Sequence, residues 1–302
     1  METRVDSRLN DFLARAEALM ARLEPLLPAV RETLDWQHSL AARWHRDGRS
    51  GYLQPLKVSL DLRLDDLLGV DRQREQLARN TRQFVAGQPA NHALLWGARG
   101  TGKSSLVRAL LAELAGEGLR LIEIERDHLA DLPRVVEQIQ GLPQRFVLFC
   151  DDLSFDAGEG DFRVLKSVLD GSLEQAPDNV LLYATSNRRH LVSEKQSDNE
   201  NWKMVDGELH PNEAVEDKIA LSDRFGLWLS FYPFTQEHFL SVVRHWVEVL
   251  AQKSGLAAWT WDEALEKEAI RWALGRGNRN GRCAYQFARY WVGRQLLEGE
   301  TP

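Results

Sequence analysis

The stretch LLWGARGTGKSSLVRALL, residues 94–111, constrains this chain more than any other part of it. Its central loop matches the P-loop pattern G-x-x-x-x-G-K-[ST]. Glycines let successive backbone N–H groups face phosphate oxygens, the lysine supplies a cation, and the serine hydroxyl suits Mg²⁺. The loop therefore predicts a site for a nucleoside triphosphate with Mg²⁺, formed by Gly97, Ala98, Arg99, Gly100, Thr101, Gly102, Lys103, Ser104 and Ser105.

The residues on either side of the loop support this interpretation. The preceding NHALLW, residues 91–96, is typical of a buried strand. After the loop, apolar residues recur at helical spacing as far as Leu114. A strand, a phosphate-binding loop and the positive end of a helix dipole then follow in order. A glycine-rich turn without a ligand is the alternative.

The rest of the middle of the chain alternates between strand-like and helix-like segments. This alternation predicts an α/β fold with a mostly parallel sheet and helices on both faces. Ligands of such sheets bind beyond the carboxyl ends of the strands. The expected strands are LRLIEIE, RFVLFCDD, NVLLYATSN and LWLSFYPF, and the expected helices are LDDLLGVDRQREQLARNTRQFV, DLPRVVEQIQ, DFRVLKSVLDGSL and EAVEDKIALSDRFG.

Polar residues end two of these apolar strands. Asp151 and Asp152 follow FVLFC, and Asn187 follows LLYATS. We expect Asp151 to hold Mg²⁺ together with Ser104, and Asp152 to orient the attacking water. Asn187 is expected to contact that water or the γ-phosphate. The alternative is that these residues only begin turns, as Asp and Asn often do.

Two helical regions are expected outside this α/β domain, which we place at residues 61–234. Residues 1–60 are expected to form an N-terminal helical arm, with one apolar stripe around Leu13 and a second helical segment at ETLDWQHSLAARWH. Residues 235–302 are expected to form a lid of three amphipathic helices. Residues 188–217 are expected to be an insert, either a solvated loop or a partner-contacting segment.

The composition limits the cellular setting. The chain has 302 residues, a net charge of −7 and two cysteines, and no run of 18 apolar residues. It is therefore expected to be cytoplasmic, with no membrane contact. The net charge argues against a general nucleic-acid binder. The basic loop RGNRNGR, residues 276–282, is expected to serve nucleotide phosphates through Arg282 rather than DNA, and the lid tryptophans are expected to be core residues.

Taken together, these motifs resemble the AAA+ ATPase superfamily. The resemblance implies ATP and Mg²⁺ as cofactors and a homo-oligomeric assembly. It also implies that Arg224 in LSDRFG is an arginine finger reaching a neighbouring subunit, and that Arg282 is a second sensor of the γ-phosphate. Gly69 and Val70 resemble the segment that packs on adenine. The alternatives are a surface ion pair for Arg224 and a solvated helix start for Arg282.

A narrower resemblance covers almost the whole chain. The segments GYLQPL, LLWGARGTGKSSLV, LFCDDLSF, YATSNRRHLV and LSDRFGLWLSFYPF are similar to a bacterial family catalogued as domain of unknown function 815. That resemblance implies an AAA+-like, ATP-binding protein and no particular biological role.

The expected function is ATP hydrolysis coupled to remodelling or loading of a macromolecular partner, protein or nucleic acid. A nucleotide-gated binding module with little turnover is one alternative, because Asp152 stands where many such ATPases carry Glu. A helicase-loader-like protein that binds single-stranded DNA is another, favoured by the arginine-rich loop. A small-molecule kinase is the third, and the predicted lid argues against it.

Overall fold

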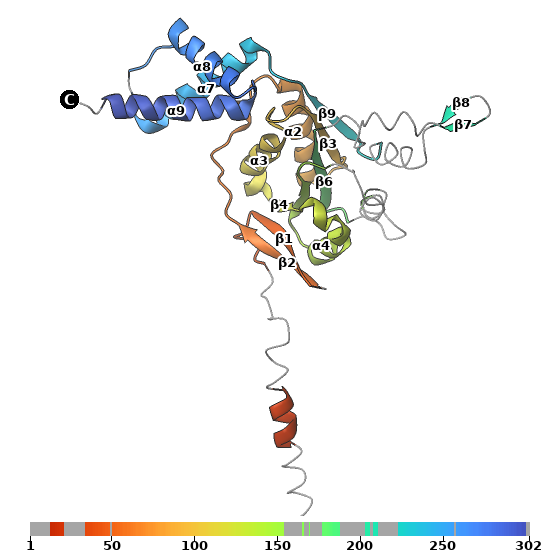
Figure 1. Ribbon diagram of the computed structural model, residues 1–302. Helices are drawn as coiled ribbons and strands as arrows, with labels where there is room; N and C mark the ends of the chain where they lie inside the picture. Colours follow the sequence, from red (N-terminus) through yellow and green to blue (C-terminus); the bar gives the residue numbers. More distant parts are fainter. Residues whose placement is uncertain are drawn as a thin grey trace, which may run out of the picture. The chain divides into compact units, whose positions relative to one another are not determined.

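The computed structural model describes residues 13–20, 34–48, 50–153, 165, 169, 177–187, 203–205, 208–210, 223–256 and 258–299. The chain divides into two units, Met1–Asp35 and Trp36–Pro302. In the first unit, residues 13–20 form a helix. All other elements below belong to the second unit (Figure 1).

A seven-stranded sheet forms the centre of the second unit, in the order β2-β1-β4-β5-β6-β3-β9. The pair β1–β2 is antiparallel, and every other neighbouring pair in this sheet is parallel. The predicted α/β fold with a mostly parallel sheet is therefore confirmed. The strands are β1 Ala41–Asp47, β2 Ser50–Leu56, β3 Ala93–Gly97, β4 Leu119–Glu123, β5 Arg145–Cys150, β6 Val180–Ser186 and β9 Leu227–Phe231.

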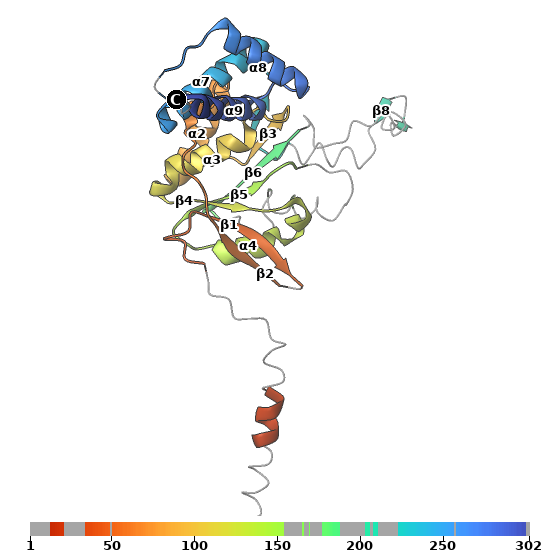
Figure 2. The same ribbon diagram turned by 60° about the vertical axis from the view of Figure 1, so that its left-hand side comes forward.

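Helices cover both faces of the sheet, which explains why its inner strands are apolar throughout. Strand β5 shows the consequence, because Val147 and Phe149 pack in one cluster with α2 (Asp71–Val85) and α3 (Lys103–Leu114). The alternate residues of β5 are buried as well. Helix α4 (Leu132–Ile139) lies on the opposite face of the sheet from α3 (Figures 1 and 2).

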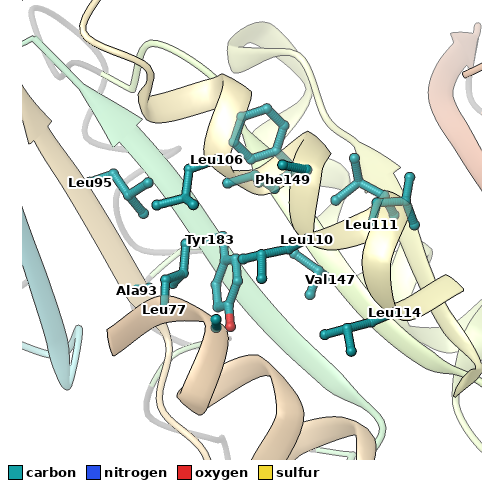
Figure 3. Packing of buried hydrophobic residues seen from close by; sticks show 14 of the residues in the cluster. Leu77, Ala93, Leu95, Leu106, Leu110, Leu111, Leu114, Val147, Phe149 and Tyr183 are labelled. Carbon is teal, nitrogen blue, oxygen red and sulfur yellow. The ribbon is translucent and has the colours of Figure 1, made fainter. Parts of the chain in front are cut away.

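Helix α3, which follows the P-loop, is anchored by its apolar side. Leu106, Leu110 and Leu114 are buried at helical spacing and pack on the sheet beside Tyr183 (Figure 3). Complete burial of one such leucine stabilises a fold by about 1.5–3 kcal/mol. The start of the helix, which carries the expected phosphate ligands, is thereby fixed relative to the strand ends.

The helical arm expected over residues 1–60, with a helical segment at ETLDWQHSLAARWH, is wrong from Ala41 to Leu56, because β1 and β2 form a hairpin within the sheet. The chain reverses between the two strands near Gly48, whose φ is 57°. Trp44 is buried, and its indole N–H donates to Asp131 Oδ2 at 3.1 Å. Pairing of β1 with the distant β4 favours the strand here, so the predicted helical arm cannot extend to residue 60.

Three helices after β9 form a separate hydrophobic cluster, which we call the lid. They are α7 Gln236–Ser254, α8 Glu263–Gly275 and α9 Gly281–Gly299, as the sequence predicts (Figure 2). Thr235 and Asp262 cap the first two helices by accepting hydrogen bonds from the backbone N–H groups of His238 and Leu265. Trp291 is buried in the cluster and Trp246 and Trp272 pack against it, in agreement with the expected core role.

Three expected features fall largely outside the described residues. These are the helix at 161–173, most of the insert at 188–217, and the helix before Arg224. Within the insert, β7 (Lys203–Val205) and β8 (Glu208–His210) form a two-stranded antiparallel sheet. Among the described residues, no helix combines the length and the apolar character that a membrane crossing requires.

Candidate nucleotide-binding site

The P-loop joins the end of β3 to the start of α3, at the carboxyl edge of the sheet. Gly97 has a φ of 130°, and a Cβ atom there would lie 1.9 Å from the carbonyl oxygen of Phe231 on neighbouring β9. Ala98 N donates to the same oxygen at 3.0 Å. Only glycine fits this approach, so the first glycine of the motif sets where the loop leaves the sheet.

Lys103 is the buried cation of the loop, with 7% of its surface exposed. Its Nζ donates to the carbonyl oxygens of Gly97 and Ala98, each at 2.7 Å, and to Asn187 Oδ1 at 3.3 Å. Burial lowers the pKa of Lys103 to about 8, although Asp151 and Asp152 oppose the shift. A desolvated ammonium held by neutral oxygens is suited to an incoming anion, because the anion supplies the missing countercharge.

Asp151 and Ser104 meet as the motifs predict. Ser104 Oγ donates to Asp151 Oδ1 at 2.6 Å, and Thr185 Oγ1 donates to the same oxygen at 2.6 Å. Thr185 Oγ1 also accepts from the backbone N–H of Asp152 at 2.9 Å. Thr185 therefore fixes both acids relative to β6. Its role was missed from the sequence, although a hydroxyl two residues before Asn187 on the same strand was an available signal.

Asp152 has a φ of 56° and is the one non-glycine residue with positive φ among the described residues. Its carboxylate accepts a hydrogen bond from Asn187 Nδ2 and pairs with Arg99 at 3.7 Å. Asn187 thus bridges Lys103 and Asp152, with the amide oxygen toward the ammonium and the amide nitrogen toward the carboxylate. One connected polar cluster thus contains the predicted residues Lys103, Ser104, Asp151, Asp152 and Asn187, joined through Thr185.

The donors near Ser104 suit Mg²⁺ bound together with a nucleotide. One hydroxyl and one carboxylate approach each other there, and Mg²⁺ commonly takes one or two protein oxygens plus phosphates and waters. The described residues contain no group of three or more His, Cys, Asp or Glu side chains placed to hold a metal alone. These oxygen donors match a cation that arrives with phosphates rather than one caged by the protein.

The lid contacts the P-loop directly. Gly281 N, at the start of α9, donates to the carbonyl oxygen of Gly100 at 2.8 Å, and Asn280 Nδ2 lies 3.4 Å from that of Arg99. Asn280 Oδ1 also accepts from Cys283 N and so caps α9. Arg282, which follows Gly281, is exposed and has no hydrogen-bond or ion-pair partner in the part of the chain that the structure describes. The expected contact of Arg282 with phosphates stays a prediction.

The segment expected to pack on adenine lies between α2 and the lid. Gly69 has a φ of 70°, and a Cβ there would lie 2.2 Å from His238 Nε2 of α7. That nitrogen lies 2.9 Å from the carbonyl oxygen of Leu68, and the imidazole stacks on Phe234 with ring centroids 3.9 Å apart. Val70 is buried in the core. The close approach of His238 gives Gly69 a structural reason beyond any ligand contact.

Arg224 lies far along the sheet from the P-loop of its own chain. It precedes β9, where Leu227 pairs with Ala93 and Phe231 pairs with Gly97. The P-loop follows Gly97, so the length of β9, about 13 Å for four residue steps, separates the two positions. The structure does not bring Arg224 into the polar cluster.

Comparisons with known proteins agree with this geometry. Residues 37–295 match the family model described as "Protein of unknown function (DUF815)". The chain belongs to the DUF815 family. No curated protein matches it in sequence.

Solved AAA+ P-loop ATPases share the DUF815 fold. The Thermotoga maritima RuvB Holliday junction branch migration motor is 14% identical, with a TM-score of 0.50, over 76% of this chain and 63% of that one. The Aeropyrum pernix ORC1 protein, solved in complex with DNA, is 15% identical, with a TM-score of 0.50, over 78% and 65%. The chain spans less than two thirds of each. These likenesses confirm the AAA+ fold of the DUF815 chain.

Proposed function

We propose that this DUF815 protein binds ATP with Mg²⁺ and hydrolyses it, and that hydrolysis drives remodelling or loading of a macromolecular partner. The observation that carries the proposal is the buried Lys103 ammonium, which donates to two P-loop carbonyls and Asn187 and has no direct carboxylate contact among the described residues. Triphosphate oxygens would replace these neutral acceptors and restore full charge pairing. A purely structural lysine would gain nothing from this arrangement.

Each residue of the cluster has a role in this proposal. Ser104 and Asp151 hold Mg²⁺, and the carboxylate of Asp152 orients the attacking water with help from Asn187. Arg282 contacts the outer phosphates from the lid, and Arg224 stabilises the charge that develops in a neighbouring subunit's site. When bound, the metal neutralises phosphate charge. The protein side chains fix the positions of the phosphates and the water.

One contact favours a second candidate, a nucleotide-gated binding module that turns over slowly. Each carboxylate oxygen of Asp152 already has a partner, Oδ1 with Asn187 and Oδ2 with Arg99, so these partners set the orientation of the carboxylate before a nucleotide binds. Hydrolysis requires that this orientation suit the attacking water, whereas ATP binding makes no demand on Asp152. The two candidates therefore share a binding site and differ in turnover.

Calorimetry with MgATP and a phosphate-release assay test the proposal together. Lys103→Ala should weaken MgATP binding roughly 10- to 100-fold, because it removes a charge-assisted contact to phosphate. Asp152→Asn should retain binding and lose turnover, since Asn tolerates the positive φ of this position. Lys57→Ala, which changes an exposed lysine, is the matched control.

The two assays separate the candidates. Unchanged MgATP binding by Lys103→Ala would refute the assignment of the P-loop site. Binding by the native chain without multiple turnover would support the slow module over the ATPase. Multiple turnover that survives Asp152→Asn would remove Asp152 from the mechanism.

A further inference from the structure

One surface of the lid concentrates positive charge in a chain whose net charge is −7. Residues 269–297, from the middle of α8 through most of α9, contain no Asp or Glu. They contain six arginines, of which only Arg294 pairs with a carboxylate, Glu268, among the described residues. The other five are exposed, namely Arg271, Arg276, Arg279, Arg282 and Arg289. The charge is therefore available to a partner outside the chain.

Aromatic rings alternate with these arginines. The guanidinium of Arg276 lies 3.5 Å from the centroid of the Trp272 ring, and Trp272 stacks on Tyr290 with centroids 4.8 Å apart. Arg289 lies 6.0 Å from the ring of Tyr285. Tyr285 and Tyr290 are 36% and 47% exposed. Two sets of ring and cation contacts therefore lie on this part of the lid, Arg276–Trp272–Tyr290 and Arg289–Tyr285.

The helical spacing places the α9 part of this surface on one side. Arg282, Tyr285 and Arg289 are separated by three and four residues, so they lie along one stripe of the helix. Seven residues of helix span about 10 Å, which is long enough to contact successive phosphates of an extended strand. Tyr290 follows Arg289 in the chain, about 100° further around α9. It stacks on Trp272 of α8, whose ring also carries the guanidinium of Arg276.

These groups have the chemistry that recognises unpaired nucleotides. A guanidinium held flat on an indole keeps its in-plane N–H donors directed outward, where they can bind phosphate oxygens. The exposed parts of the tyrosine rings offer area on which bases stack, beside the contacts of Tyr290 with Trp272 and with the Arg294 guanidinium, which lies 5.5 Å from its ring centroid. In a duplex the base faces are already occupied by neighbouring bases. An acidic protein would satisfy the charge, but it would leave the ring faces without a matching group.

We propose that the lid arginine–tyrosine face, formed by Arg276, Arg279, Arg282, Tyr285, Arg289 and Tyr290, binds a single-stranded nucleic acid. Phosphates contact the arginines and bases stack on the two tyrosines. The proposal does not rest on ATP hydrolysis, because five of the six residues of the face lie outside the proposed nucleotide site. Arg282 alone belongs to both. It identifies the macromolecular partner by its chemistry and locates where that partner binds.

Fluorescence anisotropy with the full chain and a labelled oligothymidylate of about 20 nucleotides tests the proposal, without ATP and over a range of salt concentrations. Binding should weaken steeply with salt. The triple variant Arg276→Gln, Arg279→Gln, Arg289→Gln should lower affinity at least tenfold and reduce the log–log salt slope by about two to three. The control variant Arg72→Gln, Arg79→Gln, Arg134→Gln removes the same charge from exposed arginines elsewhere and should change little.

The tyrosines separate stacking from charge attraction. Tyr285→Ala and Tyr290→Ala should each weaken binding roughly fivefold to 100-fold, as loss of one stacked base does, with the salt slope unchanged. A labelled duplex should bind more weakly than the single strand. An oligouridylate in place of the oligothymidylate shows whether the sugar matters, and binding of either strand supports the proposal.

Several results would overturn it. If the lid variant and the control variant lost the same oligonucleotide affinity, binding would depend on net charge alone and not on the lid face. A stacked single strand would be excluded if Tyr285→Ala and Tyr290→Ala bound the oligonucleotide as tightly as the native chain. It would also be excluded if the duplex or polyglutamate bound more tightly than the single strand. MgATP calorimetry on each variant shows that the protein is folded. Intact MgATP binding without oligonucleotide binding would refute this inference alone and leave the proposed nucleotide function standing.

Discussion

Lys103 and the arginines of the lid face are both cations, but the protein treats them in opposite ways. Lys103 is buried among neutral oxygens of its own chain, and burial lowers its pKa to about 8. The lid arginines are exposed, and Arg276 keeps its position by stacking on Trp272 rather than by pairing with an acid. One charge is desolvated in advance, whereas the others remain hydrated.

This difference teaches what kind of anion each region suits. A desolvated ammonium has a single geometry and favours one compact anion that brings countercharge to it. Hydrated arginines spread over two helices tolerate many positions of a long polyanion, and they lose affinity as salt rises. The predictions below test whether this division between a fixed site and an adaptable surface holds.

The largest effect is expected from Arg224, a cation that belongs to neither region. Because β9 separates it from its own P-loop, we expect it to act on a neighbouring subunit. Arg224→Ala should lower ATP turnover by about 10³-fold while MgATP binding persists, as loss of an arginine finger does in other nucleotide hydrolases. Turnover of the native chain should also rise with protein concentration. Steady-state phosphate release measures both effects.

Mixing two inactive variants tests the trans role of Arg224. A Lys103→Ala subunit retains the arginine, and an Arg224→Ala subunit retains the site, so mixed oligomers should recover part of the turnover. The absence of recovery in oligomers shown to contain both variants would contradict the trans role. A native chain that stays monomeric with ATP at every concentration would also contradict it.

The next largest effect is a pH dependence specific to Lys103. Its pKa is about 8 in the free protein, and bound phosphates should return it toward the ordinary value of 10.5. Between pH 8 and 10.5, Lys103 therefore takes up a proton when MgATP binds. As the pH rises above 8, MgATP affinity should fall by up to about tenfold per pH unit. Calorimetry in buffers of different ionisation enthalpy measures the proton uptake.

The lid face provides the contrast for this titration. Arginines stay protonated, so oligonucleotide affinity should remain flat between about pH 8 and 9, where MgATP affinity falls and thymine bases are still neutral. Lys103→Ala should abolish the pH dependence of the residual MgATP binding. Proton uptake that persists in this variant would mean that another group titrates. It would contradict the contrast between a desolvated Lys103 and hydrated lid arginines.

A smaller effect is expected where the two regions touch. Asn280→Ala removes both the cap of α9 and the contact with the Arg99 carbonyl oxygen. Loss of a cap costs about 1 kcal/mol, which should lower the melting temperature by roughly 2–4 °C and weaken MgATP binding a few-fold. Asn278→Ala is the matched control in the same loop. Equal behaviour of the two variants in thermal melts and calorimetry would show that Asn280 does not couple the lid to the P-loop.

The smallest expected effect concerns the backbone of Asp152. Its φ of 56° is tolerated by Asp, Asn and Gly but costs a longer side chain about 1 kcal/mol. Asp152→Glu should therefore lower the free energy of unfolding by about that amount in denaturant titrations, whereas Asp178→Glu should not. If the missing methylene limits hydrolysis, the same variant should still raise turnover. A stability equal to that of the native chain would show that the backbone relaxes at this position.

Much of the site follows from local sequence patterns. Apolar runs predict the strands, and parallel strands place their carboxyl ends at one edge, so Lys103, Asp151 and Asn187 meet as expected. Helical spacing predicts all three lid helices, because each presents an apolar stripe to the others. These features depend on residues that are close together in the chain, so the local pattern of apolar and polar residues is enough to predict them.

Features decided by distant contacts did not follow from the sequence. Residues 41–47 pair with β2 in a hairpin, and residues 41–43 also pair with β4, more than 70 residues later, a pairing that no local period reports. Thr185 joins the two acids only once β5 and β6 are adjacent. The cation and ring contacts of the lid face require α8 and α9 to be packed together. Whether Arg224 acts in a neighbouring subunit stays a prediction, since it depends on an assembly.

The positive φ of Asp152 also has a consequence for how this position varies by mutation. Single-base changes in an aspartate codon yield asparagine, glycine or glutamate, so all three replacements arise readily. The backbone accepts the first two without strain and penalises the third. Mutation therefore produces glutamate at position 152 as readily as asparagine or glycine. The positive φ of the backbone, and not the genetic code, disfavours glutamate there.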